Sequence, residues 1–125
     1  MRRILIVDDE PSLRDVIATV LLDAGYSVQT AADGHIALEI IDLNPPDLVI
    51  TDVMMPHLDG WALLDHAHGR NPSLPVILMS AGDWIRRRRM TPIPDHAVFL
   101  AKPFAVEELL EHIERLIGSQ PGGSE

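Results

Sequence analysis

The sequence predicts one α/β domain, a doubly wound parallel sheet of five strands with helices on both faces. Short, continuous aliphatic runs alternate with longer stretches of helical periodicity, and this alternation repeats five times along the 125 residues. Continuous apolar runs are typical of strands that are buried on both faces. Strand–helix alternation favours a parallel sheet, and right-handed crossovers leave few topologies for it. A chain of this length is enough for one compact domain.

The first half of the chain contains three expected strands and two expected helices. Residues 4–7, 26–30 and 48–51 are the strands, rich in aliphatic or β-branched side chains. Apolar residues at i, i+3, i+4 and i+7 predict a helix between Pro11, which a first turn tolerates, and Gly25, which ends it. Asp33 and Gly34 break the chain before a second apolar stripe, and residues 44–46 end that helix.

The second half contains two more strands and a strong closing helix. A helix is expected over about residues 61–68 with Asp59 as its cap, strands over 75–79 and 98–101, and a final helix over 106–117. The four arginines at 86–89 could belong to a fourth helix, which Pro92 and Pro94 keep short or irregular, ending near Met90. Residues 1–118 are therefore expected to form the domain, and residues 119–125 a flexible tail.

Composition limits the classes of partner. The formal net charge is −9 with a pI near 4.9, which disfavours direct binding to nucleic acid or to an anionic membrane. The chain has no cysteine, so disulfides and thiolate sites are excluded. No signal-like or membrane-spanning apolar run is present. We therefore expect a cytoplasmic protein. The linker-like tail fits either a stand-alone domain or a domain that continues into further chain, and of the two we expect a stand-alone domain.

Polar side chains follow the apolar runs at the carboxyl ends of four expected strands. Asp8 and Asp9 follow the first, Asp52 the third, Ser80 the fourth and Lys102 the fifth. Ligands of open parallel sheets bind outside these strand ends, so we expect the five side chains to line one pocket. Clustered carboxylates favour a hard cation such as Mg²⁺, and a carboxylate can act as a nucleophile toward phosphorus. The pattern predicts a magnesium-dependent phosphoryl site.

Four short motifs in this order resemble those of the response-regulator receiver family. They are Asp8-Asp9, Asp52-Val53-Met54-Met55-Pro56 with Asp59-Gly60, Ser80-Ala81, and Lys102-Pro103-Phe104. The resemblance covers the chain to about Gly118. It implies a flavodoxin-like sheet with strand order 2-1-3-4-5. It also implies a two-component signalling switch that is not an enzyme beyond its own phosphorylation and dephosphorylation.

The resemblance further implies roles for the residues of the site. Asp52 would accept a phosphoryl group from a sensor histidine kinase or a phosphotransfer protein. Asp9 and Asp52 would bind Mg²⁺ directly, Asp8 mainly through water, and the backbone carbonyl of Met54 would be a further ligand. Lys102 would contact the phosphoryl group.

A conformational response is implied as well. The Lys102–Pro103 peptide bond would be cis, Ser80 would move toward the phosphate, and Phe99 would move inward behind it. An output protein of unknown identity would read the change. A homodimer would form through the face between the fourth and fifth helices, although the unusual segment 86–94 suggests a partner of its own.

Three other functions are compatible with parts of this pattern. A magnesium phosphohydrolase resembling the haloacid dehalogenases would need an acid two residues after its nucleophile, and Met54 cannot transfer a proton. A flavodoxin-like cofactor binder would need a phosphate-binding glycine loop after the first strand, which is absent from the sequence. A pseudoreceiver that works without phosphorylation is the main alternative. Met54 and Gly82, at positions that tune dephosphorylation in the family, predict unremarkable self-hydrolysis.

Overall fold

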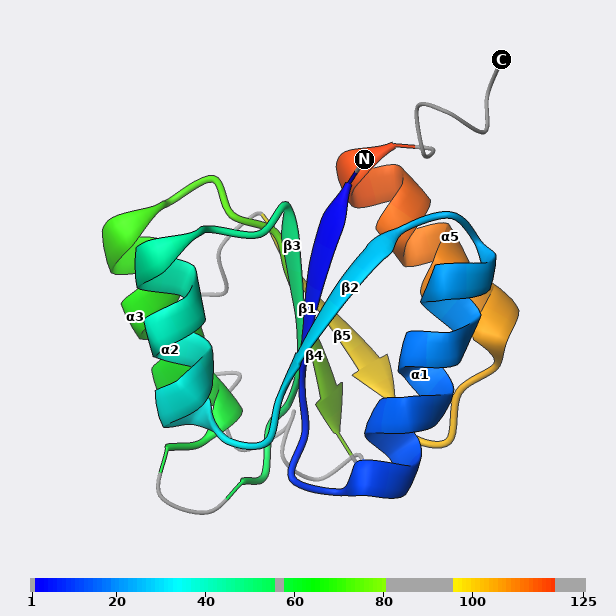
Figure 1. Cartoon of the computed structure of the whole chain (residues 1–125), viewed down its shortest axis with the longest axis horizontal. Helices are drawn as coiled ribbons and strands as arrows, with labels where there is room; N and C mark the ends of the chain where they lie inside the picture. Colours follow the sequence, from blue (N-terminus) through cyan, green and yellow to red (C-terminus); the bar gives the residue numbers. More distant parts are fainter. Residues whose placement is uncertain (1, 56–57, 81–95, 119–125) are drawn as a thin grey trace.

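Five parallel strands form the centre of the molecule, and the computed structural model describes residues 2–55, 58–80 and 96–118 of it (Figure 1). The strands are β1 (Arg3–Val7), β2 (Ser27–Ala31), β3 (Leu48–Asp52), β4 (Val76–Ser80) and β5 (Ala97–Ala101). Their order is β2-β1-β3-β4-β5, and every neighbouring pair is parallel. The predicted fold class and strand order are confirmed.

Helices cover both faces of the sheet. They are α1 (Pro11–Asp23), α2 (Gly34–Leu43), α3 (Gly60–Arg70) and α5 (Val106–Ile117). Figure 1 shows α1 and α5 together on one side of the strands and α2 with α3 on the other. These are the four helices of the described residues, whereas five were predicted; the expected fourth helix falls on residues 81–95, which lie outside them. None of the described helices is long and apolar enough to cross a membrane.

The apolar strand residues divide between two cores. Alternate residues of β1 point to opposite faces, so Leu5 and Val7 lie in the core under α2 and α3, whereas Ile4 and Ile6 lie in the core under α1 and α5. The residues of β3 and β4 divide in the same way. This two-sided burial is the physical reason why these strands appear as continuous apolar runs.

The second strand begins one residue later than predicted. Tyr26 belongs to the turn that closes α1, where its backbone N–H donates to the carbonyl of Leu21 over 3.1 Å. Gly25 before it has φ = 98°, the left-handed conformation that favours glycine after a helix. Because the aromatic ring of Tyr26 is buried in the α1–α5 core, its apolar character resembled that of a strand residue.

The register of the sheet brings the strand ends to one edge. Val7 pairs with Thr51, Asp52 with Met79, and Ser80 with Ala101. The residues that follow β1 and β5 therefore lie beside the last residues of β3 and β4. This edge is where the predicted site residues are found.

Candidate functional site

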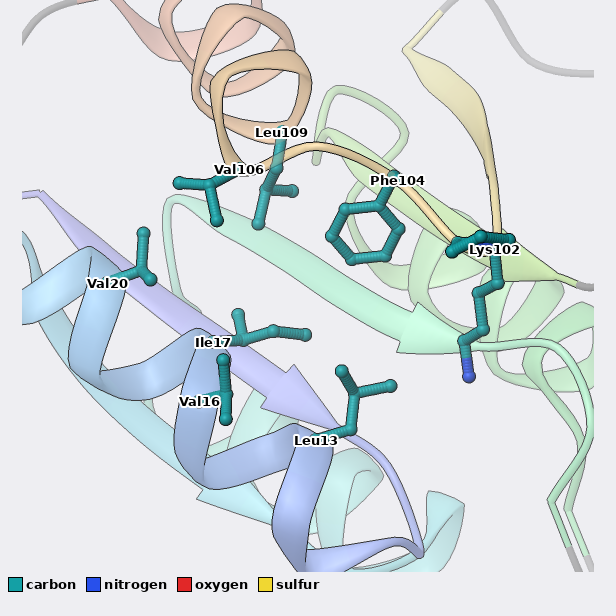
Figure 2. A pocket seen from close by; sticks show the side chains of 9 residues that line it. Leu13, Val16, Ile17, Val20, Lys102, Phe104, Val106 and Leu109 are labelled. Atoms are coloured by element: carbon teal, nitrogen blue, oxygen red, sulfur yellow. The ribbon is translucent and has the colours of Figure 1, made fainter.

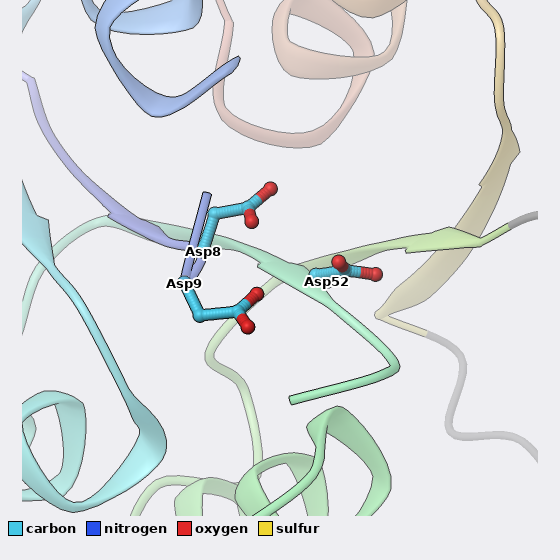
Figure 3. A group of neighbouring side chains, drawn as sticks. All are labelled: Asp8, Asp9 and Asp52. Atoms are coloured by element: carbon cyan, nitrogen blue, oxygen red, sulfur yellow. The ribbon is translucent and has the colours of Figure 1, made fainter. Parts of the chain in front are cut away.

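Three carboxylates gather at the carboxyl edge of the sheet. Asp8 and Asp9 follow β1, Asp52 is the last residue of β3, and one oxygen from each lies within 4.8 Å of the others. Figure 3 shows the three side chains converging from the ends of the two strands. The predicted clustering of these residues is therefore present in the fold.

Asp8 is the buried member of the group. Its side chain is fully buried, and Oδ1 accepts a hydrogen bond from the Glu10 backbone N–H over 2.9 Å. Oδ2 accepts no hydrogen bond from the described residues and lies 3.9 Å from the Lys102 ammonium. Burial raises the pKa of Asp8, although the Glu10 N–H and the Lys102 charge oppose this and the two other carboxylates add to it.

Asp52 is more accessible than Asp8. Its Oδ2 accepts a hydrogen bond from Lys102 Nζ over 3.2 Å, and its Oδ1 accepts one from the Met54 backbone N–H over 3.3 Å. The side chain of Asp52 is 13% exposed and that of Lys102 24%. A carboxylate held by two donors and still reachable from solvent can act as a nucleophile without a large rearrangement.

The donor set fits a hard divalent cation. The three clustered side chains offer only oxygen, which Mg²⁺ prefers. A buried carboxylate oxygen without a hydrogen-bond donor is costly unless a cation or water satisfies it, and Asp8 Oδ2 is such an atom in the described part of the chain. The arrangement can therefore hold Mg²⁺ at this edge, whereas ligation by the Met54 carbonyl stays a prediction.

Ser80 and Lys102 are brought together by the ends of β4 and β5. The Lys102 backbone N–H donates to the Ser80 carbonyl over 2.8 Å, which extends the sheet pairing beyond β5. The Ser80 hydroxyl is buried and makes no hydrogen bond within residues 2–55, 58–80 and 96–118. It is therefore available to a ligand that enters the site. The Lys102–Pro103 peptide bond is cis.

The start of α3 packs directly against the end of β3. Asp59 caps the helix as predicted, its side chain accepting from the Ala62 N–H over 2.9 Å. A Cβ at Gly60 would stand 2.5 Å from the carbonyl oxygen of Asp52, a distance that real Cβ contacts essentially never show. Glycine at this position therefore allows the close approach of α3 to the residue that carries the acceptor carboxylate.

Sequence reasoning missed two contacts near the site. The Arg14 guanidinium donates to the Asp8 carbonyl over 2.8 Å and so ties α1 to the end of β1. The ring of Phe99 on β5 lies against Trp61 on α3, with ring centroids 5.2 Å apart and an interplanar angle of 55°. Trp61 and Phe99 are distant in sequence, whereas Arg14 lies six residues after Asp8. No local pattern marks either contact.

An apolar groove lies between α1 and α5 beside the carboxylates. It has a volume of about 390 Å³ and is shown in Figure 2. Its lining residues are Leu13, Val16, Ile17, Val20, Lys102, Pro103, Phe104, Val106 and Leu109. Lys102 thus borders both the groove and the carboxylate cluster.

Comparison with known proteins gives a consistent family assignment. The family model for the response regulator receiver domain matches residues 4–114. Response regulator MprA from Mycobacterium sp. (strain KMS) is 39% identical over 115 residues, which are 92% of this chain and 50% of MprA. The probable transcriptional regulatory protein TcrX of Mycobacterium tuberculosis (strain ATCC 25618 / H37Rv) is 33% identical over 114 residues, 91% of this chain and 49% of TcrX. The chain spans about half the length of these curated relatives.

Solved structures agree with the fold. A response regulator receiver domain protein from Clostridium thermocellum superposes with a TM-score of 0.85 at 28% identity, over 94% of both chains. The receiver domain of NtrX from Brucella abortus gives a TM-score of 0.84 at 35% identity, over 94% of this chain and 99% of that one. The receiver domain of the hybrid histidine kinase CckA gives 0.75 at 37% identity, over 92% and 98%.

Proposed function

The chain belongs to the response-regulator receiver family of two-component systems, and from this premise we propose that it is a switch operated by Mg²⁺-dependent phosphorylation of Asp52. The observation that supports this most directly is the position of the Asp52 carboxylate. It lies in one cluster with the carboxylates of Asp8 and Asp9, and its Oδ2 is 3.2 Å from the Lys102 ammonium, which also lies 3.9 Å from Asp8 Oδ2. A cation held by this cluster and an ammonium beside the same carboxylate would suit the transfer of a charged phosphoryl group.

In the proposed reaction, an oxygen of Asp52 attacks the phosphorus of a phosphohistidine on a sensor kinase or phosphotransfer protein. The oxygen–phosphorus bond forms as the phosphorus–nitrogen bond of the donor breaks, and the donor imidazole leaves. Mg²⁺, held by Asp9 and Asp52 with Asp8 acting through water, would offset the charge on the transferring oxygens. The Met54 carbonyl would complete the protein ligands.

Lys102 and Ser80 would hold the product. The Lys102 ammonium already donates to Asp52 Oδ2 over 3.2 Å, so a small movement would bring it to a phosphoryl oxygen. The Ser80 hydroxyl, buried at the end of the neighbouring strand, would donate to another phosphoryl oxygen. Phe99 on β5 would then move inward and change the surface that an output protein reads.

The partners are proposed at the level of class. A histidine kinase or phosphotransfer protein supplies the phosphoryl group, and a cytoplasmic location of the chain follows from that role. The formal net charge of −9 argues against direct contact of this chain with nucleic acid. The output protein, or the homodimer that transmits the signal, would bind a surface altered by phosphorylation.

The test is intact mass after incubation with acetyl phosphate, with and without Mg²⁺. We expect a gain of one phosphoryl group that needs Mg²⁺ and is absent from Asp52→Ala. Asp23→Asn is a suitable control because this exposed carboxylate lies beyond the site, at the last residue of α1. It should be phosphorylated like the parent protein.

Phosphorylation of Asp52→Ala would place the acceptor elsewhere and contradict the proposal. If acetyl phosphate gives no product, a histidine kinase donor and beryllofluoride, a mimic of the phosphoryl group, are tried next. Failure of all three would favour a pseudoreceiver that signals without phosphorylation.

A further inference from the structure

Trp61 joins the start of α3 to the middle of β5. Its side chain is 6% exposed, and its ring lies 5.2 Å, centroid to centroid, from the ring of Phe99. Phe99 is only half-buried and packs on the edge of the α2–α3 core. A buried ring on α3 thus packs against a partly exposed ring on β5.

The Phe99 side chain lies on the same face of the sheet as Ser80. Phe99 pairs with Leu78 and Ser80 with Ala101 in the parallel register of β4 and β5. Paired residues of neighbouring strands point to the same side, and so do residues two apart along one strand. Phe99 is therefore the diagonal neighbour of Ser80 on the face covered by α3.

The first turn of α3 has little freedom to move independently of β3. The Gly60 N–H donates to the Val53 carbonyl over 2.8 Å, and the Gly60 Cα lies so close to the Asp52 carbonyl that no Cβ would fit. Trp61 is the next residue along the chain. One side of this turn thus contacts the end of the acceptor strand, and the other contacts Phe99.

We propose that Trp61 transmits the phosphorylation state of Asp52 into α3 by following the movement of the Phe99 ring. The inference rests on the proposed function and goes beyond it, since it adds α3 to the elements that respond. A hydroxyl that moves toward a phosphoryl group leaves space beside Phe99. Because interiors are close-packed, movement of the ring into that space alters its contact with Trp61.

The test is ¹⁹F NMR of protein labelled with 5-fluorotryptophan. Trp61 and Trp84 are the two tryptophans of the chain, so Trp84→Phe leaves Trp61 as the only labelled site. In this background, addition of Mg²⁺ and beryllofluoride should shift the Trp61 resonance. Phe99→Leu, which removes the ring but keeps an apolar side chain, should abolish most of that shift, and Phe99→Tyr should retain it.

Phe104→Leu is the matched control. Phe104 is also half-buried and also lies within a few residues of Lys102, but it packs in the α1–α5 core on the opposite face of the sheet. It should leave the response of Trp61 to beryllofluoride unchanged. If Phe99→Leu and Phe104→Leu reduced the shift of the Trp61 resonance equally, the proposal would be overturned, because loss of either aromatic ring would then have the same effect.

A parallel thermal unfolding measurement distinguishes failure of this inference from failure of the proposed function. If Mg²⁺ and beryllofluoride raise the melting temperature but the Trp61 resonance stays in place, this inference is wrong and the proposed function stands. If the resonance shifts equally in Phe99→Leu, the signal reaches α3 through Gly60, and the inference is again wrong. If beryllofluoride raises the melting temperature of no variant, and neither acetyl phosphate nor a histidine kinase donor adds a phosphoryl group, both proposals fail.

Discussion

The carboxyl group of Asp8 is fully buried, and one of its two oxygens has no hydrogen-bond donor among the described residues. Two further carboxylates lie close to it, and the Lys102 ammonium, 3.9 Å away, offsets only part of the negative charge. A buried charge in such surroundings destabilises the folded state when no cation is bound. The raised pKa of Asp8 has the same cause.

Asp8→Asn is therefore expected to stabilise the metal-free protein at neutral pH. The change removes the buried charge, and the amide oxygen can still accept from the Glu10 N–H. We expect a gain of about 1 kcal/mol or more in the free energy of unfolding, measured by urea denaturation in EDTA. Asp9→Asn is the control; because Asp9 is exposed, this substitution should change the free energy of unfolding much less. Destabilisation by Asp8→Asn would contradict this account.

The raised pKa of Asp8 also determines the direction in which this residue changes the free energy of unfolding with pH. The pKa of Asp8 is higher in the folded protein than its ordinary value of 3.8, so between the two values the folded state binds more protons. Asp8 therefore adds to the stability of the metal-free protein as the pH falls from neutral through its raised pKa, and adds nothing further below 3.8. With saturating Mg²⁺, protonation of Asp8 competes with the metal, and metal-dependent stability is lost over the same range.

The measurement is urea denaturation as a function of pH, in EDTA and in Mg²⁺. Other carboxylates also titrate, so the quantity compared is the difference in the free energy of unfolding between the parent protein and Asp8→Asn. That difference should shrink in EDTA as the pH falls. A difference that does not change with pH would show that Asp8 keeps one protonation state.

The clustering of Asp8, Asp9 and Asp52 could be predicted because each follows a strand, and parallel strands end at one edge. The contrast between buried Asp8 and exposed Asp9 could not. It depends on how the chain turns after β1, which tertiary contacts such as the Arg14 hydrogen bond to the Asp8 carbonyl help to set. The Trp61–Phe99 contact escaped prediction for the same reason, because periodicity indicates a face and not a partner.

At the scale of elements, α3 approaches β3 so closely at one end that its two glycines differ in the space available for a side chain. A Cβ at Gly60 would clash with backbone atoms of Asp52 and Val53, whereas one at Gly69 meets nothing within 4 Å. Gly60→Ala should lower the free energy of unfolding by about 1–3 kcal/mol and slow the phosphorylation of Asp52, since backbone must shift. Urea denaturation and the phosphorylation time course measure these effects.

Gly69→Ala is the matched control within the same helix. Glycine within a helix is less favourable than alanine, so this change should raise the free energy of unfolding by up to about 1 kcal/mol. It should leave phosphorylation unaltered, because a Cβ at this position meets no other atom within 4 Å. If Gly60→Ala were equally harmless, the close packing of α3 on the end of β3 would be wrong.

Element boundaries show where local patterns suffice. The cap at Asp59 was predicted from its side chain, and the structure confirms it. Asp33 and Gly34 were read as a break before a helix, yet Asp33 is itself the cap and accepts from the Ile36 N–H, and Gly34 is the first helical residue. Leu58 packs so closely against Gly34 that a Cβ there would approach within 2.7 Å, which accounts for glycine at the first helical position. This is a tertiary cause that the local sequence does not show.

At the scale of the whole molecule, the fold was predictable because the central strands β1, β3 and β4 carry the signal of burial on both faces and helical stretches separate the strands. The strand order came from the family resemblance, since apolar runs alone do not say which strands are neighbours. The identity of the output partner has no such signal, because it depends on a surface and not on the core. To the predicted cluster of carboxylates the structure adds the burial of Asp8 and the positions of Asp8 and Asp52 relative to the Lys102 ammonium.

Binding of Mg²⁺ at this edge should therefore stabilise the entire domain. A ligand that binds only the folded state adds about 1.4 kcal/mol to the free energy of unfolding for each tenfold rise in its concentration above the dissociation constant. We expect this slope in urea denaturation with MgCl₂, with NaCl at equal ionic strength as the control for screening of the −9 net charge. Asp9→Asn should weaken the response, whereas Asp23→Asn, on an exposed carboxylate distant from the cluster, should preserve it. An equal response to both salts would mean that Mg²⁺ acts only by general screening, and the carboxylates would not form a binding site.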